Sequence, residues 1–502
     1  MFLLFLANPF GIGCILFFSC IWEQLLYTFR KEINTFYDTD VAVIGGGVAG
    51  TAAAIAAARN GSKVMLIEQN GCLGGLATLG HVSPFDATKD RAGKSFGGIA
   101  QEILNNMDKA QQDYGVPDSP IKREGPHLLK WVMLKMAVES GVEVLFHAGL
   151  IDVEVENDTI QHIIISTKSG LRGVRAKNFI DATGDADLVY LTGEEFIIGS
   201  EESAEEGLKK AGFDRMHFEK DDAVAQVAPQ TTVNCAVQPV SIMFTMGNVD
   251  ISKQPAKFNN KLLKYEDLGI TKEEFEKLPY AGTVGFEENG DLIPLPQGRI
   301  LIGRTGRPGE MLVNMSRVIG VNATDADELT KAEITAQMQV MYIVDFLKRF
   351  VPGFENSFLV ESGNTLGVRE TRRLIGKYVL KGIDAIDCLH FDDDVACGSY
   401  MIDIHDPHGK RKAIGGDLLG TCYGIPYRSL LPKTVKNMLV CGRCISADHV
   451  AHASTRIQGT CCMTGQAAGT AAAMANSEEI TPAKVSVEEL RAKLLADGVY
   501  LG

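Results

Sequence analysis

The chain has 502 residues, of which 45% are hydrophobic and 22% are charged, and this balance is ordinary for a globular protein. Its length predicts about two to four structural units. The formal net charge of −14 disfavours nucleic acid and anionic membrane surfaces as partners, although a buried arginine can still bind an anionic small molecule.

Residues 1–22 form an uncharged, apolar stretch that is long enough to span a bilayer. A secretory signal peptide would begin with positive charge, which this stretch lacks. Arg30 and Lys31 follow it and would hold the main body on the cytoplasmic side. Three interpretations of residues 1–36 stay open: a membrane anchor, a spurious extension of the reading frame, or a poor signal sequence.

A dinucleotide-binding pattern begins at Asp38. Residues 38–59 predict a short strand and then an alanine-rich helix, joined by Gly45, Gly47 and Gly50. A second predicted strand ends at Glu68. The glycines permit a tight turn, close approach to a pyrophosphate and close helix packing, while the acid can accept from ribose hydroxyls. The helix N-terminus would face the phosphates.

The sequence after this unit favours FAD over NAD. The glycine-rich stretch GCLGGLATLGH, residues 71–81, can run alongside a flavin. Residues 141–170 alternate and turn like a small antiparallel meander. Residues 176–188 then predict a strand that ends in the loop Ala182-Thr183-Gly184.

These stretches carry a family resemblance, together with GVRETRRLIGKYVL at 367–380 and YMIDIHDPHG at 400–409. The chain resembles the FAD-dependent oxidoreductases of the glutathione-reductase-like flavoprotein superfamily. More narrowly, it is similar to the group related to the flavin part of heterodisulfide reductase. The resemblance covers roughly residues 38–476 and implies an α/β fold. A discontinuous Rossmann-like FAD-binding domain would carry an inserted α+β substrate or cap domain.

The resemblance also implies a division of the chain. Within the middle part, we expect a charged helix at 199–226, a strand at 238–250 and a long amphipathic helix at 327–353. Ser486 should cap a short C-terminal helix. The expected parts are residues 1–36, an apolar segment; 37–190, the first part of the FAD domain; 191–420, the substrate or cap domain; 421–480, the closing strand and helix of the FAD domain; and 481–502, the C-terminal helix.

The stretch CGRC at 441–444 can be interpreted as a redox or metal pair. The resemblance instead places it at the turn that lies by the FAD phosphates, before a closing helix whose N-terminus points at the flavin pyrimidine. A metal site would need two further suitably spaced ligands. The eleven cysteines are odd in number and lack regular spacing, so we expect reduced thiols, a cytoplasmic protein and no metal site.

Two cysteine patterns of related enzymes are missing. Thiol–disulfide reductases usually carry two cysteines in the loop after the ribose acid, whereas Cys72 stands alone here. The iron–sulfur cysteines of heterodisulfide reductase are also absent. The resemblance therefore does not extend to those two activities. The residues that we expect at the cofactor are Gly45, Gly47, Val48, Ala49, Gly50, Glu68, Gly74, Gly75, Ala77, Thr78, Ile151, Ala182, Thr183, Gly184, Gly442, Arg443, Gly459 and Thr460.

Four residues are candidates for the chemistry. The stretch HASTRIQG at 452–459 resembles HGANRLGG of fumarate reductase flavoproteins, in which the arginine binds a substrate carboxylate, so Arg456 is expected to clamp an anion. His405 lies in a family motif and suits acid–base work. Arg369 and His81 are further candidates, with structural roles as the alternative.

The sequence thus predicts an FAD-dependent oxidoreductase that transfers a hydride between a polar small organic substrate and flavin N5. Its partners would be that substrate and an unknown electron acceptor or donor. Nucleic acid is not expected, and a membrane only if residues 1–22 are a real anchor. The alternatives are an electron-transfer flavoprotein that passes electrons between protein partners, and a structural use of FAD.

Overall fold

The computed structural model describes residues 32–33, 35–82, 85–116, 125–200, 236–253, 255–261, 263–277, 293–407 and 414–502. The N-terminal apolar stretch and nearly all of the expected charged helix at 199–226 lie outside these ranges. Within them, no helix is both long enough and apolar enough to cross a membrane.

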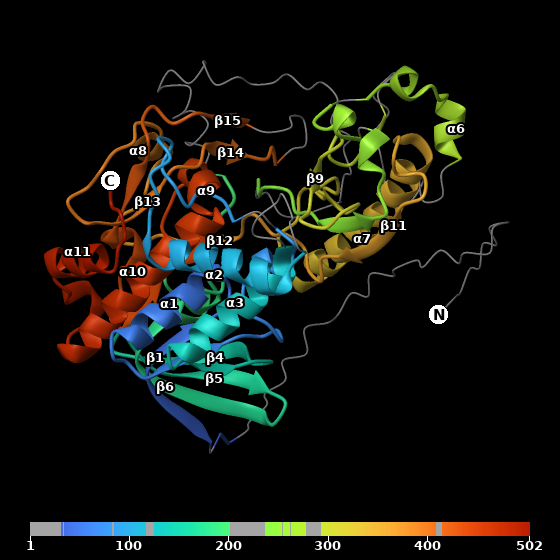
Figure 1. Ribbon diagram of the computed structural model, residues 1–502. Helices are drawn as coiled ribbons and strands as arrows, with labels where there is room; N and C mark the ends of the chain where they lie inside the picture. The colour runs from blue at the N-terminus through green and yellow to red at the C-terminus, as the bar shows by residue number, and fades with distance from the viewer. Residues whose placement is uncertain are drawn as a thin grey trace.

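A seven-stranded sheet forms the centre of the larger lobe (Figure 1). Its order is β3-β2-β1-β6-β5-β4, and β17 pairs with the last residues of β6. Strands β3, β2, β1, β6 and β17 are parallel, whereas β4, β5 and the start of β6 form the predicted antiparallel meander. The strands are β1 (Phe36–Ile44), β2 (Val64–Ile67), β3 (Glu143–Leu145), β4 (Gly149–Glu156), β5 (Thr159–Thr167), β6 (Gly170–Asp181) and β17 (Met438–Val440).

The centre of the sheet is buried on both faces, because the second half of β1 and all of β2 and β17 are apolar and buried. Val41 and Val43 of β1 join the core beneath the helices, whereas Ala42 and Ile44 join the core on the opposite face. Figure 1 shows α1, α2 and α3 above the sheet, with α10 beside α1. These helices are α1 (Val48–Arg59), α2 (Gly98–Tyr114), α3 (Gly125–Glu139) and α10 (Gln458–Ser477).

Helices α1 and α10 approach each other more closely than side chains would allow. A Cβ atom on Gly465 would lie 2.1 Å from the carbonyl oxygen of Ala49, and one on Gly469 would lie 2.1 Å from that of Ala53. Glycine is therefore required at both positions. This contact joins the two ends of the discontinuous domain, as the sequence predicts.

The smaller lobe is an antiparallel sheet of order β11-β8-β10-β9 with α7 packed against it (Figure 1). Asp325 caps α7 by accepting from the amides of Asp327 and Glu328, and the helix ends just before Pro352. The elements of this lobe are β8 (Phe244–Gly247), α6 (Lys272–Glu276), β9 (Ile302–Arg304), β10 (Met311–Val313), α7 (Ala326–Phe350) and β11 (Phe358–Ser362).

The remaining elements pack on the larger lobe. Ser486 caps α11 by accepting from the amide of Glu489, as predicted. The pairs are β7 with β12, β13 with β16, and β14 with β15. The elements are α4 (Asp187–Thr192), β7 (Phe196–Ile198), β12 (Arg372–Leu374), α8 (Gly382–Ile386), β13 (Asp394–Gly398), β14 (Ile402–Ile404), β15 (Ile414–Gly416), β16 (Tyr423–Pro426), α9 (His449–Thr455) and α11 (Val487–Ala496).

The hydrophobic cores suggest a shorter inserted domain than the sequence did. Buried residues between Val240 and Leu366 form the core of the smaller lobe. Buried residues between Leu380 and Leu431 instead share the core of α1 and α10. We therefore propose that the inserted domain centres on residues 240–368, within the expected 191–420. The α/β class and the discontinuous Rossmann-like domain are confirmed.

Replacing Gly469 with alanine should destabilise the protein, because the new methyl group would overlap the Ala53 carbonyl. Overpacking of this kind costs about 1–3 kcal/mol. Gly303→Ala is the matched control, since a Cβ atom there meets nothing within 4 Å. Chemical denaturation measures both variants. Equal stability of the two would show that the helices separate freely.

Candidate active site

A cavity of about 350 Å³ lies where β1, β2, β6 and β17 end, beside the smaller lobe. Ligands of open α/β sheets bind at this edge, outside the carboxyl ends of the parallel strands. Residues of the smaller lobe, such as Leu366 and Val368, close one side. The expected cofactor residues that line it are Gly45, Gly47, Val48, Ala49, Glu68, Gly74, Gly75, Ala77, Ala182, Thr183, Gly184, Gly442 and Arg443.

The three glycines of the first turn have different surroundings. Gly45 has φ +100°, and a Cβ atom on it would lie 2.5 Å from the carbonyl oxygen of Ala182. A Cβ atom on Gly50 would lie 1.8 Å from the carbonyl oxygen of Gly45, so Gly50 serves packing. A Cβ atom on Gly47 would meet nothing within 4 Å and would project into the cavity that Gly47 lines. Bare backbone at a helix N-terminus fits a pyrophosphate.

Glu68 is held rigidly at the end of β2. Its Oε2 accepts from the Gly46 amide at 2.7 Å, and its Oε1 accepts from the backbone and side-chain nitrogens of Asn70 at 2.7 and 2.8 Å. The side chain is almost fully buried, yet it borders the cavity. Its remaining lone pairs suit ribose hydroxyl groups.

Arg443 borders the cavity from the turn after β17. Its Nη2 donates to Asp185 Oδ1 at 2.6 Å, while its buried Nη1 has no partner among the described residues. A buried guanidinium with an unused donor fits a phosphate oxygen. The residues present therefore fit a dinucleotide on both the α1 side and the β17 side.

Four expected cofactor residues besides Gly50 do not line this cavity. Thr78 turns inward and donates to the carbonyl oxygen of Leu73 at 2.8 Å. Gly459 and Thr460 lie in the first turn of α10, where the Gly459 amide donates to the carbonyl oxygen of Asp86. Ile151 is 46% exposed, and its neighbour Leu150 lines the cavity instead. Ile151 lies where the pairing of β4 with β5 is irregular, and Asp152 beside it is exposed as well.

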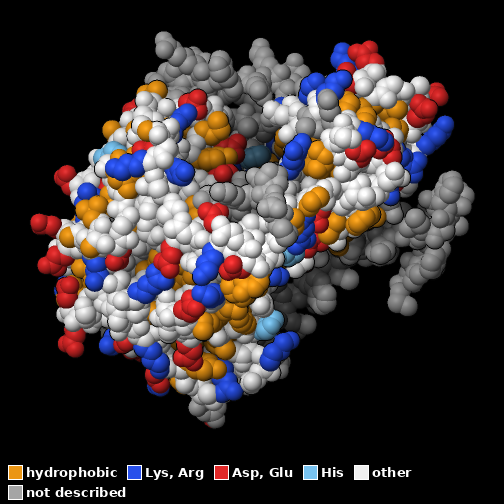
Figure 2. Space-filling model, viewed as in Figure 1, with side chains coloured by type: hydrophobic (Ala, Val, Ile, Leu, Met, Phe, Trp, Pro, Cys, Tyr) orange, Lys and Arg blue, Asp and Glu red, His pale blue; other side chains and the backbone are white. Residues whose placement is uncertain are grey.

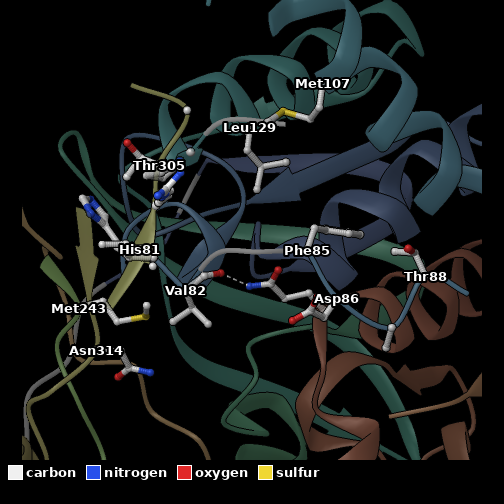
Figure 3. A pocket seen from close by; sticks show the side chains of 18 of the residues that line it. His81, Val82, Phe85, Asp86, Thr88, Met107, Leu129, Met243, Thr305 and Asn314 are labelled. Carbon is white, nitrogen blue, oxygen red and sulfur yellow. Dashed lines mark hydrogen bonds between the residues drawn. The ribbon is translucent and has the colours of Figure 1, made fainter. Parts of the chain in front are cut away.

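A second cavity of about 1010 Å³ adjoins the first, since Gln458 lines both. It lies at the meeting of the two lobes, where Figure 2 shows the surface hollowed. In Figure 3, Met107 and Leu129 approach from the helices on one side, while His81 and Thr305 lie together at one end. Its mixture of apolar and polar side chains suits an organic molecule.

His81 lines this larger cavity, as a catalytic role would require. Its φ is 54°, which is uncommon for any residue other than glycine. Burial lowers the pKa of its imidazole. The ring Nδ1 lies 4.0 Å from Glu361 Oε1, and the same oxygen lies 2.7 Å from His127 Nε2.

Arg456 is the expected catalytic residue that borders the smaller cavity. It follows α9 directly, and its Nη2 donates to the backbone oxygen of Asp403 at 3.0 Å and to Asp403 Oδ2 at 3.3 Å. Its buried Nε has no partner among the described residues. This guanidinium therefore retains a donor for an anion.

Asp403 links Arg456 to His405. The Oδ2 atom of Asp403 lies 3.3 Å from His405 Nε2 as well as from the arginine. Burial opposes the charge on Asp403, but His405 and Arg456 hold its pKa well below its usual range. His405 itself lines neither cavity. Burial and the nearby Arg369 lower its pKa to about 4, so its ring is neutral at pH 7.

Arg369 lies behind this group and lines neither cavity. Its Nη1 donates to the carbonyl oxygen of Pro239 at 2.7 Å. Burial, and then the positive charge of Arg456, lower its pKa to about 9. The sequence signalled Asp403 only weakly: it precedes His405 by two residues, which places both side chains on one side of an extended segment.

The other charged residues of these motifs have structural partners. Arg372 pairs with Asp187 at 2.9 Å, and the buried Arg373 pairs with Glu370. His449 Nδ1 also lies 2.8 Å from Glu370 Oε1. These contacts anchor α9, which carries Arg456. His452 is fully buried in the same helix.

The CGRC cysteines are buried packing residues. Cys441 and Cys444 are fully buried, and burial raises the pKa of both thiols. The Cys444 thiol lies 3.7 Å from the carbonyl oxygen of Cys441. Within the described ranges, no three histidine, cysteine or acidic side chains are arranged to hold a metal ion.

Comparisons with known proteins agree with a dinucleotide-binding redox fold. The sequence pattern of the FAD dependent oxidoreductase family matches residues 40–494. Thiamine thiazole synthase of Aeropyrum pernix is 31% identical over 175 residues, which is 33% of this chain and 61% of that protein. The solved structure of the flavin-dependent brominase Bmp2 covers 92% of this chain, and this chain covers 83% of it, with 12% identity and a TM-score of 0.40.

A bacteriochlorophyll reductase-like structure from Thermoplasma acidophilum gives 14% identity and a TM-score of 0.34, with 93% of each chain covered. Likeness at this level says nothing about substrate. The fold and the cavity define a dinucleotide-dependent flavoenzyme. The chain belongs to the FAD dependent oxidoreductase family, and FAD is its cofactor.

Gly47→Val should fold but bind FAD more weakly. The backbone at Gly47 has φ −64° and ψ −176°, which valine adopts readily, and its Cβ atom meets no protein atom. The side chain would instead occupy the space of the pyrophosphate. We expect FAD affinity to fall at least about tenfold, or about 1.4 kcal/mol, as measured by flavin fluorescence titration. Undiminished FAD binding would show that the pyrophosphate of FAD does not bind beside Gly47.

Proposed function

We propose that this flavoenzyme oxidises or reduces a small polar organic anion, such as a carboxylate, that binds where the two cavities adjoin. The observation that carries the proposal is the Arg456 guanidinium, which borders the flavin cavity with an unused buried donor. The match of its motif to fumarate reductase flavoproteins supports the same role. Bidentate binding of carboxylates is the chemistry that arginine does best.

The charges around Arg456 favour an anion. The guanidinium groups of Arg317, Arg369 and Arg456 act on one another or on the same acids, and the acids that act on them are Asp403 and Asp406. Positive charge thus gathers beside Arg456. A bound carboxylate would offset it.

The substrate anion would also activate His405. In the absence of substrate, its pKa is held near 4 by burial and by Arg369, so the ring is a weak base. A carboxylate bound beside Arg456 would offset that positive field and raise the pKa towards neutral pH. The proton of the reaction would then pass to His405 across the Asp403 contact. A base near the working pH is the most effective.

When bound, FAD supplies a ring nitrogen that accepts or donates a hydride. The protein residues do the remaining work: Arg456 orients the substrate, and the larger cavity holds its organic part. A second cavity of about 1010 Å³ favours a small-molecule substrate over a purely protein-to-protein electron carrier. We also propose that an electron acceptor or donor completes the reaction. A relationship to the flavin part of heterodisulfide reductase and a cytoplasmic location are proposed as well.

Arg456→Gln should weaken anion binding while FAD stays bound. Simple carboxylates added to the oxidised protein should perturb the flavin absorbance of the wild type but not of this variant. We expect a loss of roughly 10²-fold in affinity, about 2–3 kcal/mol, for a buried charge-assisted contact. Arg428→Gln is the control, because that arginine pairs with Asp393 outside both cavities. Identical titrations in all three proteins would contradict the proposal.

His405→Gln separates proton transfer from positioning. Glutamine can still donate to Asp403 but cannot take up a proton. Anaerobic reduction of the flavin by a panel of small hydroxy acids should therefore slow roughly 10²–10⁴-fold in both His405→Gln and His405→Ala. Substrate binding should stay near normal in the glutamine variant. If glutamine restores the wild-type rate, His405 only positions Asp403.

A further inference from the structure

The residues of a cluster of cysteine, histidine and aspartate line neither of the two cavities at the flavin side. It is built by the loop between α8 and β13, by β13 itself and by the residue before β16. Figure 1 shows β13 beside α8, on the side of the larger lobe that also holds α11. The members are Cys388, His390, Asp394, Cys397 and Cys422.

The strand pairing brings these residues together. Gly398 of β13 lies opposite Tyr423 of β16, so Cys397 and Cys422 become neighbours, and their thiols hydrogen-bond. The Cys422 sulfur lies 3.9 Å from His390 Nε2. On the other side of the ring, His390 Nδ1 lies 2.8 Å from Asp394 Oδ2. The order thiol, imidazole, carboxylate is that of an activated nucleophile.

The environment favours a thiolate–imidazolium pair. A hydrogen bond from Cys397, and then one from His390, lower the pKa of Cys422 to about 5 despite burial. Hydrogen bonds to Asp394 and to Cys422 raise the pKa of His390 to about 10. Both groups are therefore charged at neutral pH. By contrast, burial raises the pKa of the Cys441 thiol and leaves it inert.

We propose that Cys422 is a reactive thiol, activated by His390 and oriented through Asp394, that exchanges with small disulfides. The Cys422 sulfur attacks one sulfur of the reagent, so that a new S–S bond forms and the original S–S bond breaks. The second thiol leaves as a thiolate and takes the proton from His390. The product is a mixed disulfide on Cys422, and no further oxidant is needed.

Access is narrow, which limits the reagent to small molecules. The Cys422 residue is 3% exposed, but the side chain of His390 is 40% exposed and opens onto a shallow surface cavity of about 570 Å³. Cys388 is half-buried at the same place and accepts from the Gly420 amide at 3.2 Å. The proposal for Cys422 does not depend on the identity of the flavoenzyme's substrate.

The first test compares alkylation rates in the FAD-loaded, reduced protein. Iodoacetamide at pH 6 should label Cys422 before the more exposed Cys72 and Cys388, with each peptide followed by mass spectrometry. Cys441 and Cys444 should stay unlabelled. If exposure alone decides, Cys72 and Cys388 react first and Cys422 reacts only in denaturant, which would overturn the proposal.

His390→Asn tests the activation itself. Without the imidazole, the pKa of the Cys422 thiol should rise towards its ordinary value of about 8.5, and the hydrogen bond from Cys397 limits that rise. A full return would lower the thiolate fraction at pH 6 roughly 300-fold and make the remaining thiolate roughly 30-fold more nucleophilic. The labelling rate at pH 6 should therefore fall by up to about tenfold, whereas above about pH 8 the variant should react faster than the wild type.

Parallel pH profiles for the wild type and His390→Asn would refute the activation. His162→Asn, at a half-buried histidine of β5, is the matched control. Flavin content reports folding. If His390→Asn fails to fold, the thiolate absorbance of the wild type at 240 nm, minus that of Cys422→Ser, gives the pKa directly, and a value near 8.5 overturns the proposal.

The second test uses glutathione disulfide as the probe. At pH 7 the wild type should gain the mass of one glutathionyl group on the Cys422 peptide, and dithiothreitol should remove it. Cys422→Ser should gain none at that peptide. An unmodified Cys422 under conditions that modify Cys72 would show that small disulfides do not reach the site.

Discussion

The close contact between α1 and α10 is the constraint on which the site depends. Gly465 and Gly469 place one helix backbone directly against Ala49 and Ala53 of the other. No side chain separates the two backbones at these positions, so the two helices pack side by side on the same face of the sheet. The contact joins segments more than 400 residues apart in the sequence. It thereby brings the first glycine-rich turn and the turn at Arg443 to opposite sides of one cavity.

The same arrangement explains where the buried charges gather. The smaller lobe meets the larger one at this edge, and Arg369, Asp403 and Arg456 come from different segments that cross there. Charges removed from water are costly unless they are paired. Asp403 contacts both His405 and Arg456, and so stabilises a positive group that has an unused donor. A pocket that is incompletely neutralised by the protein is suited to a charged ligand.

The sequence predicted the local units well because each depends on residues close together in the chain. The strand, turn and helix around Gly45, Gly47 and Gly50 are confirmed, as are the meander, the long helix α7 and the cap at Ser486. Their patterns are therefore visible in the sequence alone. The FAD-binding fold follows from these units together with the closing helix α10, whose small residues pack against α1.

Other features depend on contacts that the sequence order does not reveal. Ile151 was expected at the cofactor, but it lies at an irregularity of strand β4, and Leu150 lines the cavity. Arg369 and His405 belong to family motifs, yet they lie one contact behind Arg456 and reach the cavity only through neighbours. The boundary of the inserted domain likewise follows from which core each segment joins. These outcomes are set by packing between distant segments.

The reactivity of the cysteines also depends on contacts between segments that are distant in the sequence. CGRC places two thiols close together in the sequence, but the turn buries both, and burial and the nearby Asp181 favour the neutral thiol. Cys397 and Cys422 share no sequence motif, yet a two-stranded pairing places them together beside an imidazole. Reactivity of a thiol depends on which charges surround it. Spacing along the chain therefore identifies a reactive cysteine only when the fold also supplies the base.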